Sequence, residues 1–110
     1  MTEETKKMIA EFTAQRNWDQ YHSPKNLAIS ISLEAAELLE NFQWVESDEA
    51  VSGKLPKIEE ELADVLVYCE QLCAKLGLDQ DEIIARKMEK NERKYPVDKA
   101  YGSCLKYDEL

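Results

Sequence analysis

Apolar residues recur every three or four positions along most of the chain, which is the spacing of a buried stripe on an α-helix. On this basis we expect helices over residues 3–16, 24–42, 56–76 and 80–93. Only three glycines and three prolines occur in 110 residues, which also favours helices over other structure. The predicted fold class is therefore all-α, with a four-helix-bundle-like arrangement in a single domain, 1–110.

Local capping residues set the expected helix boundaries. Ser23 and Pro24 suit the N-cap and first position of the second helix, and Pro56 suits the start of the third. Gly77 suits the left-handed residue that ends the third helix. Asp79 then begins a capping box for the fourth. Three of the four predicted helices thus have a start or stop residue of the expected type.

The clearest loop is expected between the second and third helices, at residues 45–55, which are rich in acids, serine and glycine. Trp44 lies just before this loop. A tryptophan there is more often a plug in the core than a platform for a ligand. On the first helix, Met8, Ile9 and Phe12 are expected to face inward, with Thr13 or Ala14 as a further candidate.

Two of the predicted helices carry paired acids at the edge of their apolar stripes. Glu34 and Glu37 are spaced i, i+3 on one, and Glu61 and Asp64 have the same spacing on the other. In each pair the first acid lies at the edge of the stripe and the second lies about 60° further round the helix. If the two helices pack together, the four carboxylates gather at the margin of a common core.

Four carboxylates in a partly buried place cannot all stay ionised and unpaired, because desolvation and like-charge repulsion both oppose it. A hard divalent cation is the usual remedy. An all-oxygen set without cysteine or histidine suits Mg²⁺, with Mn²⁺ as a substitute, rather than zinc. The alternative is that these acids are simply a solvated helix margin.

Aromatic and hydrogen-bonding residues are concentrated between the first two helices. This stretch could staple the helices together, or it could stack on and hydrogen-bond a planar ligand. His22 is the only histidine, so any histidine-based catalysis depends on it. The stretch consists of Trp18, Asp19, Gln20, Tyr21 and His22.

Three more residues could serve the same site. Tyr68 follows Asp64 by one turn and lies about 20° from Glu61 around the helix, so its ring is expected to point toward the acidic margin. The alternative is a tyrosine at the edge of the core with its hydroxyl in water. Lys87 and Asn91 are spaced i, i+4. They could supply the positive charge and the amide that a triphosphate needs, or simply offset nearby acids.

Composition and charge narrow the class of protein. The formal net charge of −9 argues against binding to a nucleic acid polymer or an anionic membrane. We expect no membrane span, because no run of 18 apolar residues occurs. The N-terminus lacks the apolar core of a secretion signal. The three cysteines, Cys69, Cys73 and Cys104, do not have the spacing of metal ligands. Their odd number fits a reducing, cytoplasmic location.

The acidic motif, Glu34-x-x-Glu37 followed by Glu61-x-x-Asp64, resembles that of the all-α nucleoside triphosphate pyrophosphatases, the MazG-like superfamily. The likeness covers about residues 8 to 109 and points to the dCTP pyrophosphatase branch. Its further motifs are Trp18-Asp19-Gln20-Tyr21-His22, Pro24-x-Asn26-Leu27, Phe42-Gln43-Trp44, Tyr68, Lys87-Met88, Asn91 and Tyr95-Pro96.

The resemblance implies a role for each matching residue. The four acids Glu34, Glu37, Glu61 and Asp64 would hold magnesium and act in catalysis through metal-activated water. The chain departs from the vertebrate-type enzymes in two places. It has Ile9 where those enzymes have a histidine, nine residues before the pocket tryptophan. The loop between the two acidic helices also looks shorter in this chain. The implied nucleotide pocket consists of Trp18, Asp19, Gln20, Tyr21, His22, Trp44, Tyr68 and Asn91, with Lys87 as a phosphate contact.

The expected protein is thus a single MazG-type domain that hydrolyses a nucleoside triphosphate, dCTP or a related or modified deoxynucleotide, to the monophosphate and pyrophosphate. The resemblance further implies a compact homodimer or homotetramer with sites partly at subunit interfaces, and a task in nucleotide pool sanitation or control. The rival interpretation is a non-catalytic dimerisation or adaptor module. A di-iron bundle is disfavoured, because it needs Glu-x-x-His pairs and neither acidic segment has a histidine.

Overall fold

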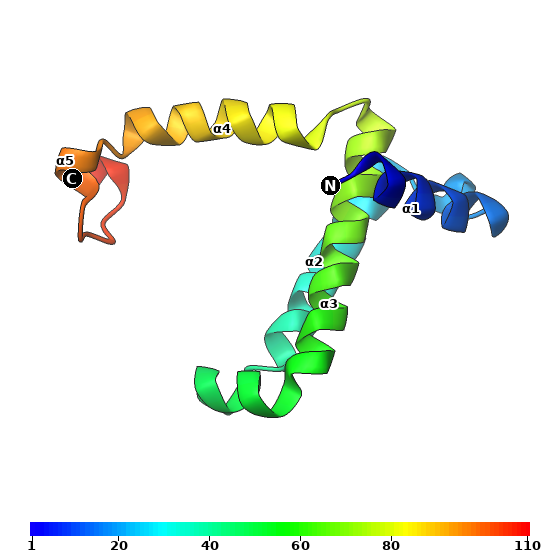
Figure 1. The fold of residues 1–110 in the computed structure, drawn as a ribbon, viewed down its shortest axis with the longest axis horizontal. Coiled ribbons are helices and arrows are strands. Elements are labelled where there is room, and N and C mark those ends of the chain that lie inside the picture. Colours follow the sequence, from blue (N-terminus) through cyan, green and yellow to red (C-terminus); the bar gives the residue numbers. More distant parts are fainter. The chain divides into compact units, whose positions relative to one another are not determined.

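The computed structural model describes residues 1–110, and none of them lies in a β-strand (Figure 1). This confirms the predicted all-α fold class. The chain forms two compact units, residues 1–77 and 78–110, which are treated separately below. The elements in order are α1 (Glu3–Gln15), η1 (Asp19–Tyr21), α2 (Pro24–Glu40), α3 (Ser47–Leu76), α4 (Gln80–Lys94), α5 (Val97–Ala100) and η2 (Tyr107–Glu109).

The helix boundaries predicted at Ser23, Gly77 and Asp79 are confirmed. The Ser23 hydroxyl accepts from the amide of Asn26 at 3.1 Å, and Pro24 is the first residue of α2. The Asp79 carboxylate accepts from the amide of Glu82 at 3.1 Å and caps α4. Gly77 has a left-handed conformation (φ 67°) and ends α3.

The predicted loop at residues 45–55 is wrong. α3 already begins at Ser47, where Asp48 and Glu49 in the first turn favour a helix N-terminus, and the turn comprises residues 41–46 instead. α3 consists of two helical stretches joined at a kink, and Pro56 lies in the first turn of the second stretch, close to the predicted start. Because proline disfavours helical geometry in the residues before it, the break appears as a kink at Lys54 (φ −129°, ψ 18°).

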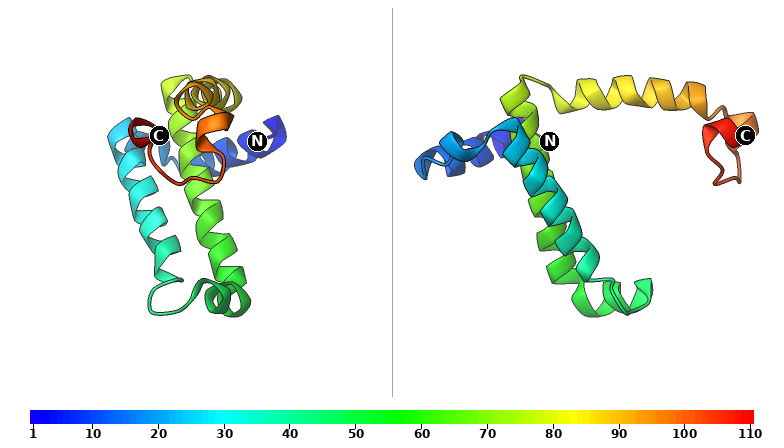
Figure 2. Two further views of the ribbon diagram at one scale, coloured as in Figure 1. Left: turned by 90° about the vertical axis from the view of Figure 1, so that its left-hand side faces the viewer. Right: turned by 180° about the vertical axis from the view of Figure 1, so that it is seen from behind.

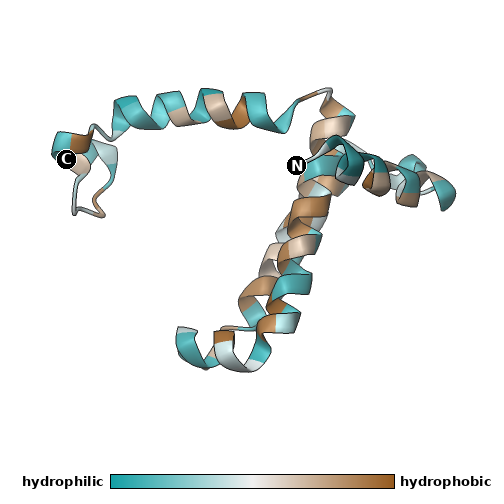
Figure 3. Cartoon of the chain, in the orientation of Figure 1, coloured by the Kyte–Doolittle hydropathy of each residue, from teal (hydrophilic) through white to brown (hydrophobic).

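The core of residues 1–77 lies where α2 and α3 run side by side (Figures 1 and 2). Leu27 of α2 is fully buried, and Cys73 of α3 is also buried. Apolar positions nevertheless extend along both helices (Figure 3), and several remain open to solvent. The half-exposed ones on these two helices include Ile29, Leu33, Leu62 and Leu66. A single copy therefore covers only part of its apolar helix surface.

α1 packs on α3, and the two helices share a polar contact. The side-chain amide of Gln71 donates to the hydroxyl of Thr13 at 2.8 Å, and Thr13 is buried. Ile9 is half-buried, but Met8 and Phe12 are exposed by about half or more. The inward positions predicted at Ile9 and Thr13 are thus confirmed, whereas those at Met8 and Phe12 are wrong.

Residues 78–110 consist of α4 and a tail folded against its C-terminal end. The rings of Tyr95 and Tyr107 meet edge to face with centroids 6.3 Å apart, and the ammonium of Lys94 lies 4.8 Å from the Tyr107 ring centroid. These contacts hold the tail in place. In neither unit is any helix long and apolar enough to cross a membrane.

Candidate functional site

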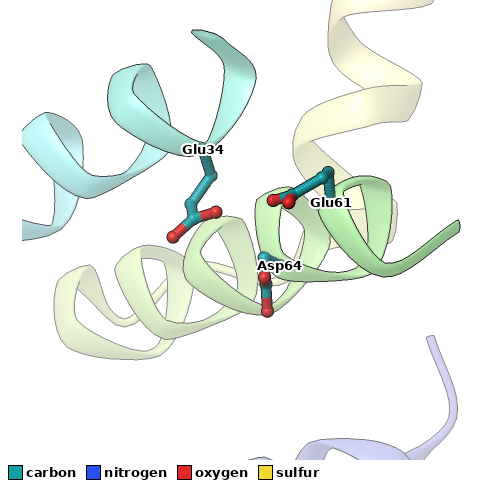
Figure 4. Close-up of side chains that lie close together, drawn as sticks. All are labelled: Glu34, Glu61 and Asp64. Carbon is teal, nitrogen blue, oxygen red and sulfur yellow. The ribbon is translucent and has the colours of Figure 1, made fainter. Parts of the chain in front are cut away.

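The structure brings together carboxylates from two helices (Figure 4). Glu34 reaches from α2, and Glu61 and Asp64 come from α3; one ligand oxygen from each lies within 4.8 Å of the others. Glu37 joins the group, because it is close enough to Glu34 and Glu61 to raise the pKa of both carboxyls. We call these four residues the carboxylate cluster. Pairs separated by 27 residues in sequence thus converge, as the matched offsets on the two helices predict.

Burial, together with the crowding of like charges, raises the pKa of two carboxyls in this cluster. Burial raises the pKa of Glu34 to about 7, and the hydrogen bond with Glu37 and the charges of Glu37, Asp64 and Glu61 act in the same direction. The pKa of Glu61 is raised by burial and by Glu37 and Asp64, although the charge of Lys57 opposes the rise. Near neutral pH the cluster therefore holds on to a proton that a cation could replace.

The donor atoms of the cluster also fit a divalent cation. One oxygen each of Glu34 and Glu61, the Oε2 atoms, is buried without a hydrogen-bond partner. An unpaired buried acceptor costs about 1–3 kcal/mol, and more when it is charged. Oxygen-only donors from two facing helices, with acceptors left unsatisfied, are the ligands that magnesium or manganese prefers.

A cavity of about 300 Å³ adjoins the carboxylate cluster. Asp64 belongs to both, so the cavity opens beside the acids. The rings of His22 and Tyr68 meet edge to face at 6.4 Å, and Trp18 packs against Phe12 at 5.7 Å. The complete lining is Met8, Ile9, Phe12, Trp18, His22, Asp64, Val67, Tyr68 and Gln71. An apolar, aromatic cavity with a few polar groups is suited to a planar ligand.

The other residues of the aromatic stretch lie differently. Asp19 lines a second cavity of about 440 Å³, which His22 shares. Gln20 donates from its side-chain amide to the carbonyl of Asn17 at 2.9 Å. Tyr21 accepts at its backbone carbonyl from the side chain of Asn26 at 2.9 Å, with its ring exposed. In this chain Gln20 and Tyr21 hold the turn together and do not line either cavity.

Trp44 is not the core plug that its position favours. It is 92% exposed, and its backbone is left-handed (φ 69°), which is rare for a bulky residue. Lys87 and Asn91 lie on α4, in the unit of residues 78–110. The side-chain amide of Asn91 contacts the sulfur of Met88 at 3.9 Å.

Sequence reasoning missed several residues of the cavity wall, most importantly Val67 and Gln71. Both follow Asp64 at helical spacing, three and seven residues on, on the side that Tyr68 also occupies. Following the face of the helix that carries Asp64 and Tyr68 for one more turn beyond Tyr68 would have identified both residues. The remaining missed positions, Met8 and Phe12, come from α1.

Comparison with known proteins identifies the family of this chain. Residues 29–110 match the MazG-like family. The chain belongs to the MazG-like family. It is 37% identical to mouse dCTP pyrophosphatase 1 and 38% identical to the human protein, in each case over 98% of this chain, and it spans 66% of the length of each. This likeness confirms the predicted resemblance to the dCTP pyrophosphatase branch.

A solved structure supports the MazG-like fold. The crystal structure of a pyrophosphatase from Archaeoglobus fulgidus is 51% identical to this chain, with a TM-score of 0.82. The match covers 86% of this chain and 91% of that one. The all-α architecture is therefore shared with a protein described as a pyrophosphatase.

Proposed function

We propose that this MazG-like chain is a magnesium-dependent nucleoside triphosphate pyrophosphohydrolase. It cleaves the bond between the α and β phosphates of dCTP, or of a related or modified deoxynucleotide, and releases the monophosphate and pyrophosphate. The observation that carries the proposal is the convergence of carboxylates within 4.8 Å beside an aromatic cavity. The names of the mouse, human and archaeal relatives support the same chemistry.

Glu34, Glu37, Glu61 and Asp64 would hold the metal, since they supply only oxygen donors and two buried oxygens lack partners. A bound magnesium, or manganese in its place, would supply positive charge for the phosphates and lower the pKa of a nearby water. A carboxylate oxygen that does not ligate would accept a hydrogen bond from the attacking water and orient it. The lone histidine is then not needed as a base.

The aromatic cavity would bind the nucleobase. Trp18, His22 and Tyr68 would enclose a planar ring by stacking and edge contacts, next to Asp64. Because the chain carries a net charge of −9, the triphosphate also needs positive partners. Lys87 would contact a phosphate and Asn91 the sugar or base, both from α4.

We also propose that the chain acts as a homo-oligomer, a dimer or a tetramer. The half-exposed apolar side chains of α2 and α3, such as Leu33 and Leu66, would be covered by a second copy. The exposed ring of Trp44, whose backbone is strained, would contact the site of a neighbouring copy. Light scattering coupled to gel filtration tests this, and a monomer at micromolar concentration would contradict it.

The three cysteines are free thiols. This fits the predicted cytoplasmic location, which stays a prediction.

The deciding experiment is incubation of the protein with dCTP and magnesium, with separate detection of pyrophosphate and orthophosphate. We expect pyrophosphate and dCMP in equal amounts, and neither in excess EDTA. Orthophosphate as the sole inorganic product would show that a different bond is cut. A panel of normal and modified triphosphates would then rank the substrates.

A thermal melt separates the enzyme from an adaptor module. Magnesium that binds the native state raises the melting temperature by mass action. We expect such a rise for the wild-type protein and its loss in Glu37→Gln. An adaptor whose acids only interact with solvent would show no rise in either.

A further inference from the structure

Gln71, which lines both the aromatic cavity and the cavity of about 440 Å³, has a side-chain hydrogen-bond acceptor without a partner. Gln71 lies on α3 seven residues after Asp64, and both line the aromatic cavity together with Tyr68. The side-chain oxygen Oε1 of Gln71 is buried, and no donor reaches it. Buried polar atoms without a partner are rare in native proteins, so this oxygen calls for a donor from outside the chain.

The orientation of the Gln71 amide is decided by its neighbour on α1. Its Nε2 donates to the Thr13 hydroxyl oxygen at 2.8 Å, and that hydroxyl donates its own proton to the Ile9 carbonyl at 3.2 Å. Since the hydroxyl proton is already used, only a lone pair of Thr13 faces Gln71, and the amide must present its N–H group to it. Oε1 is then left as an acceptor. Thr13 is 3% exposed, so water does not compete for this bond.

The rest of the cavity wall sets the kind of ligand that would supply the donor. Ile9, Phe12 and Val67 contribute no side-chain hydrogen-bonding group, and Asp64 is part of the carboxylate cluster. A planar base between the aromatic rings would meet Gln71 as a neutral acceptor held in one orientation. Cytosine carries an exocyclic amino group, which donates, whereas uracil and thymine carry a carbonyl at the same ring position, which would be repelled.

We propose that Gln71 is a specificity-determining residue whose side-chain carbonyl, oriented by Thr13, accepts a hydrogen bond from the exocyclic amino group of a pyrimidine and disfavours a carbonyl at that place. This rests on the proposed function, because the ligand is taken to be the base of the nucleotide substrate. Oε1 is closed to water in the free chain, so the cavity side chains adjust around the ligand as the bond forms.

The test compares kcat/KM for dCTP and dUTP in variants of both residues. Gln71→Met keeps the volume of the side chain and removes the amide, so we expect its dCTP/dUTP ratio to fall about tenfold. Thr13→Val frees the amide to turn and should lower the ratio by a smaller factor, about threefold, while Thr13→Ser keeps the wild-type ratio. Gln15→Met, the same change on α1 away from the cavities, is the control and should leave the ratio unchanged.

A binding measurement keeps the inference separate from the proposed function. Tryptophan fluorescence titrated with dCMP and dUMP in EDTA reports on the base cavity without hydrolysis. If the wild-type protein hydrolyses neither triphosphate, the proposed function fails, but a dCMP preference that Gln71→Met abolishes still supports the role of Gln71. Binding without such a preference in the wild-type protein would overturn it.

Two further results would also overturn the inference. In the first, Gln71→Met lowers the melting temperature while the ratio of kcat/KM for dCTP to that for dUTP stays within twofold of wild type. This result would show that Gln71 has a purely structural role. In the second, Gln71→Met raises the ratio, which means that the amide presents its N–H group to a base carbonyl. Should Gln71→Met not fold, Thr13→Val decides between the same outcomes, because it leaves Gln71 in place.

Discussion

The two units of the chain differ most in their charge. Residues 1–77 hold 15 acidic and 7 basic side chains, whereas residues 78–110 hold 8 and 7, so nearly all of the net charge of −9 belongs to the first unit. The carboxylate cluster lies in that unit as well. The acidity of this protein is thus concentrated where a cation would be bound, and the second unit is close to neutral.

The units also differ in what holds them together. In the first, α2 packs along α3, and a hydrogen bond from Gln71 to Thr13 ties together positions 58 apart in sequence. In the second, the basic end of α4 and its tail surround a pocket of about 400 Å³ that includes Lys90, Arg93 and Lys94. The first unit therefore fixes acids and rings in position, while the second carries cations suited to phosphate.

The largest effect should come from the acidic unit. Asp64→Asn removes the residue shared by the cluster and the cavity, and we expect pyrophosphate release from dCTP to fall by roughly 10²–10³-fold, the effect of losing one fixed electrostatic group. Glu40→Gln, the same kind of charge loss at an exposed position of α2, is the matched control. Activity of Asp64→Asn within threefold of the control would break the assignment of the acids.

A smaller effect should come from the near-neutral unit. Lys87→Met removes one proposed phosphate contact, and a hydrogen bond to a charged group contributes about 1.5–3 kcal/mol, so kcat/KM should fall by roughly tenfold to a hundredfold, mainly through KM. Lys106→Met in the same unit should leave steady-state kinetics unchanged. Equal losses in both variants would show that only the overall charge of this unit matters.

Trp44 tests whether the strained turn of the first unit serves function or stability. Its left-handed backbone costs about 1–2 kcal/mol for any residue with a Cβ, so Trp44→Gly should be about 1 kcal/mol more stable than Trp44→Ala. Urea unfolding measures this difference. Both variants should lose activity if the ring serves a neighbouring copy. Equal stabilities of the two variants would show that the turn is not strained.

The smallest effect concerns pH in the metal-free protein. The pKa of Glu34 is raised from 4.5 to about 7 in the native state, so the folded chain binds more protons than the unfolded chain between these values. Stability from this group is present below about pH 4.5 and is lost as the pH rises through 7. Because solvent screens part of this shift at a side chain that is only partly buried, we expect the melting temperature in EDTA at pH 5.5 to exceed that at pH 7.5 by roughly 2–4 °C.

Two controls sharpen the pH prediction. Glu34→Gln should flatten the trend, since it removes the group that titrates. Magnesium should reverse it, because the cation competes with the proton for the carboxylates. A melting temperature that rises with pH in EDTA would contradict the shift.

Local patterns in the sequence were enough to determine the helices and most of their ends. Ser23, Gly77 and Asp79 act through bonds or backbone conformations within a few residues, which need no knowledge of distant contacts. The same periodicity placed Glu34 and Glu61 at matching edges of two apolar stripes. It failed at residues 45–55, because the acidic turn before Pro56 forms helix despite its loop-like composition.

Only the tertiary structure decided which groups meet. Helical spacing assigns a residue to a face, but the rotation and sliding of one helix against another depend on side-chain packing between distant segments. The convergence of Glu34 with Asp64, the exposure of Trp44 and the bond from Gln71 to Thr13 all depend on that packing. The residue types thus determined what chemistry is available, and the packing of α1 and α2 on α3 decided where it comes together.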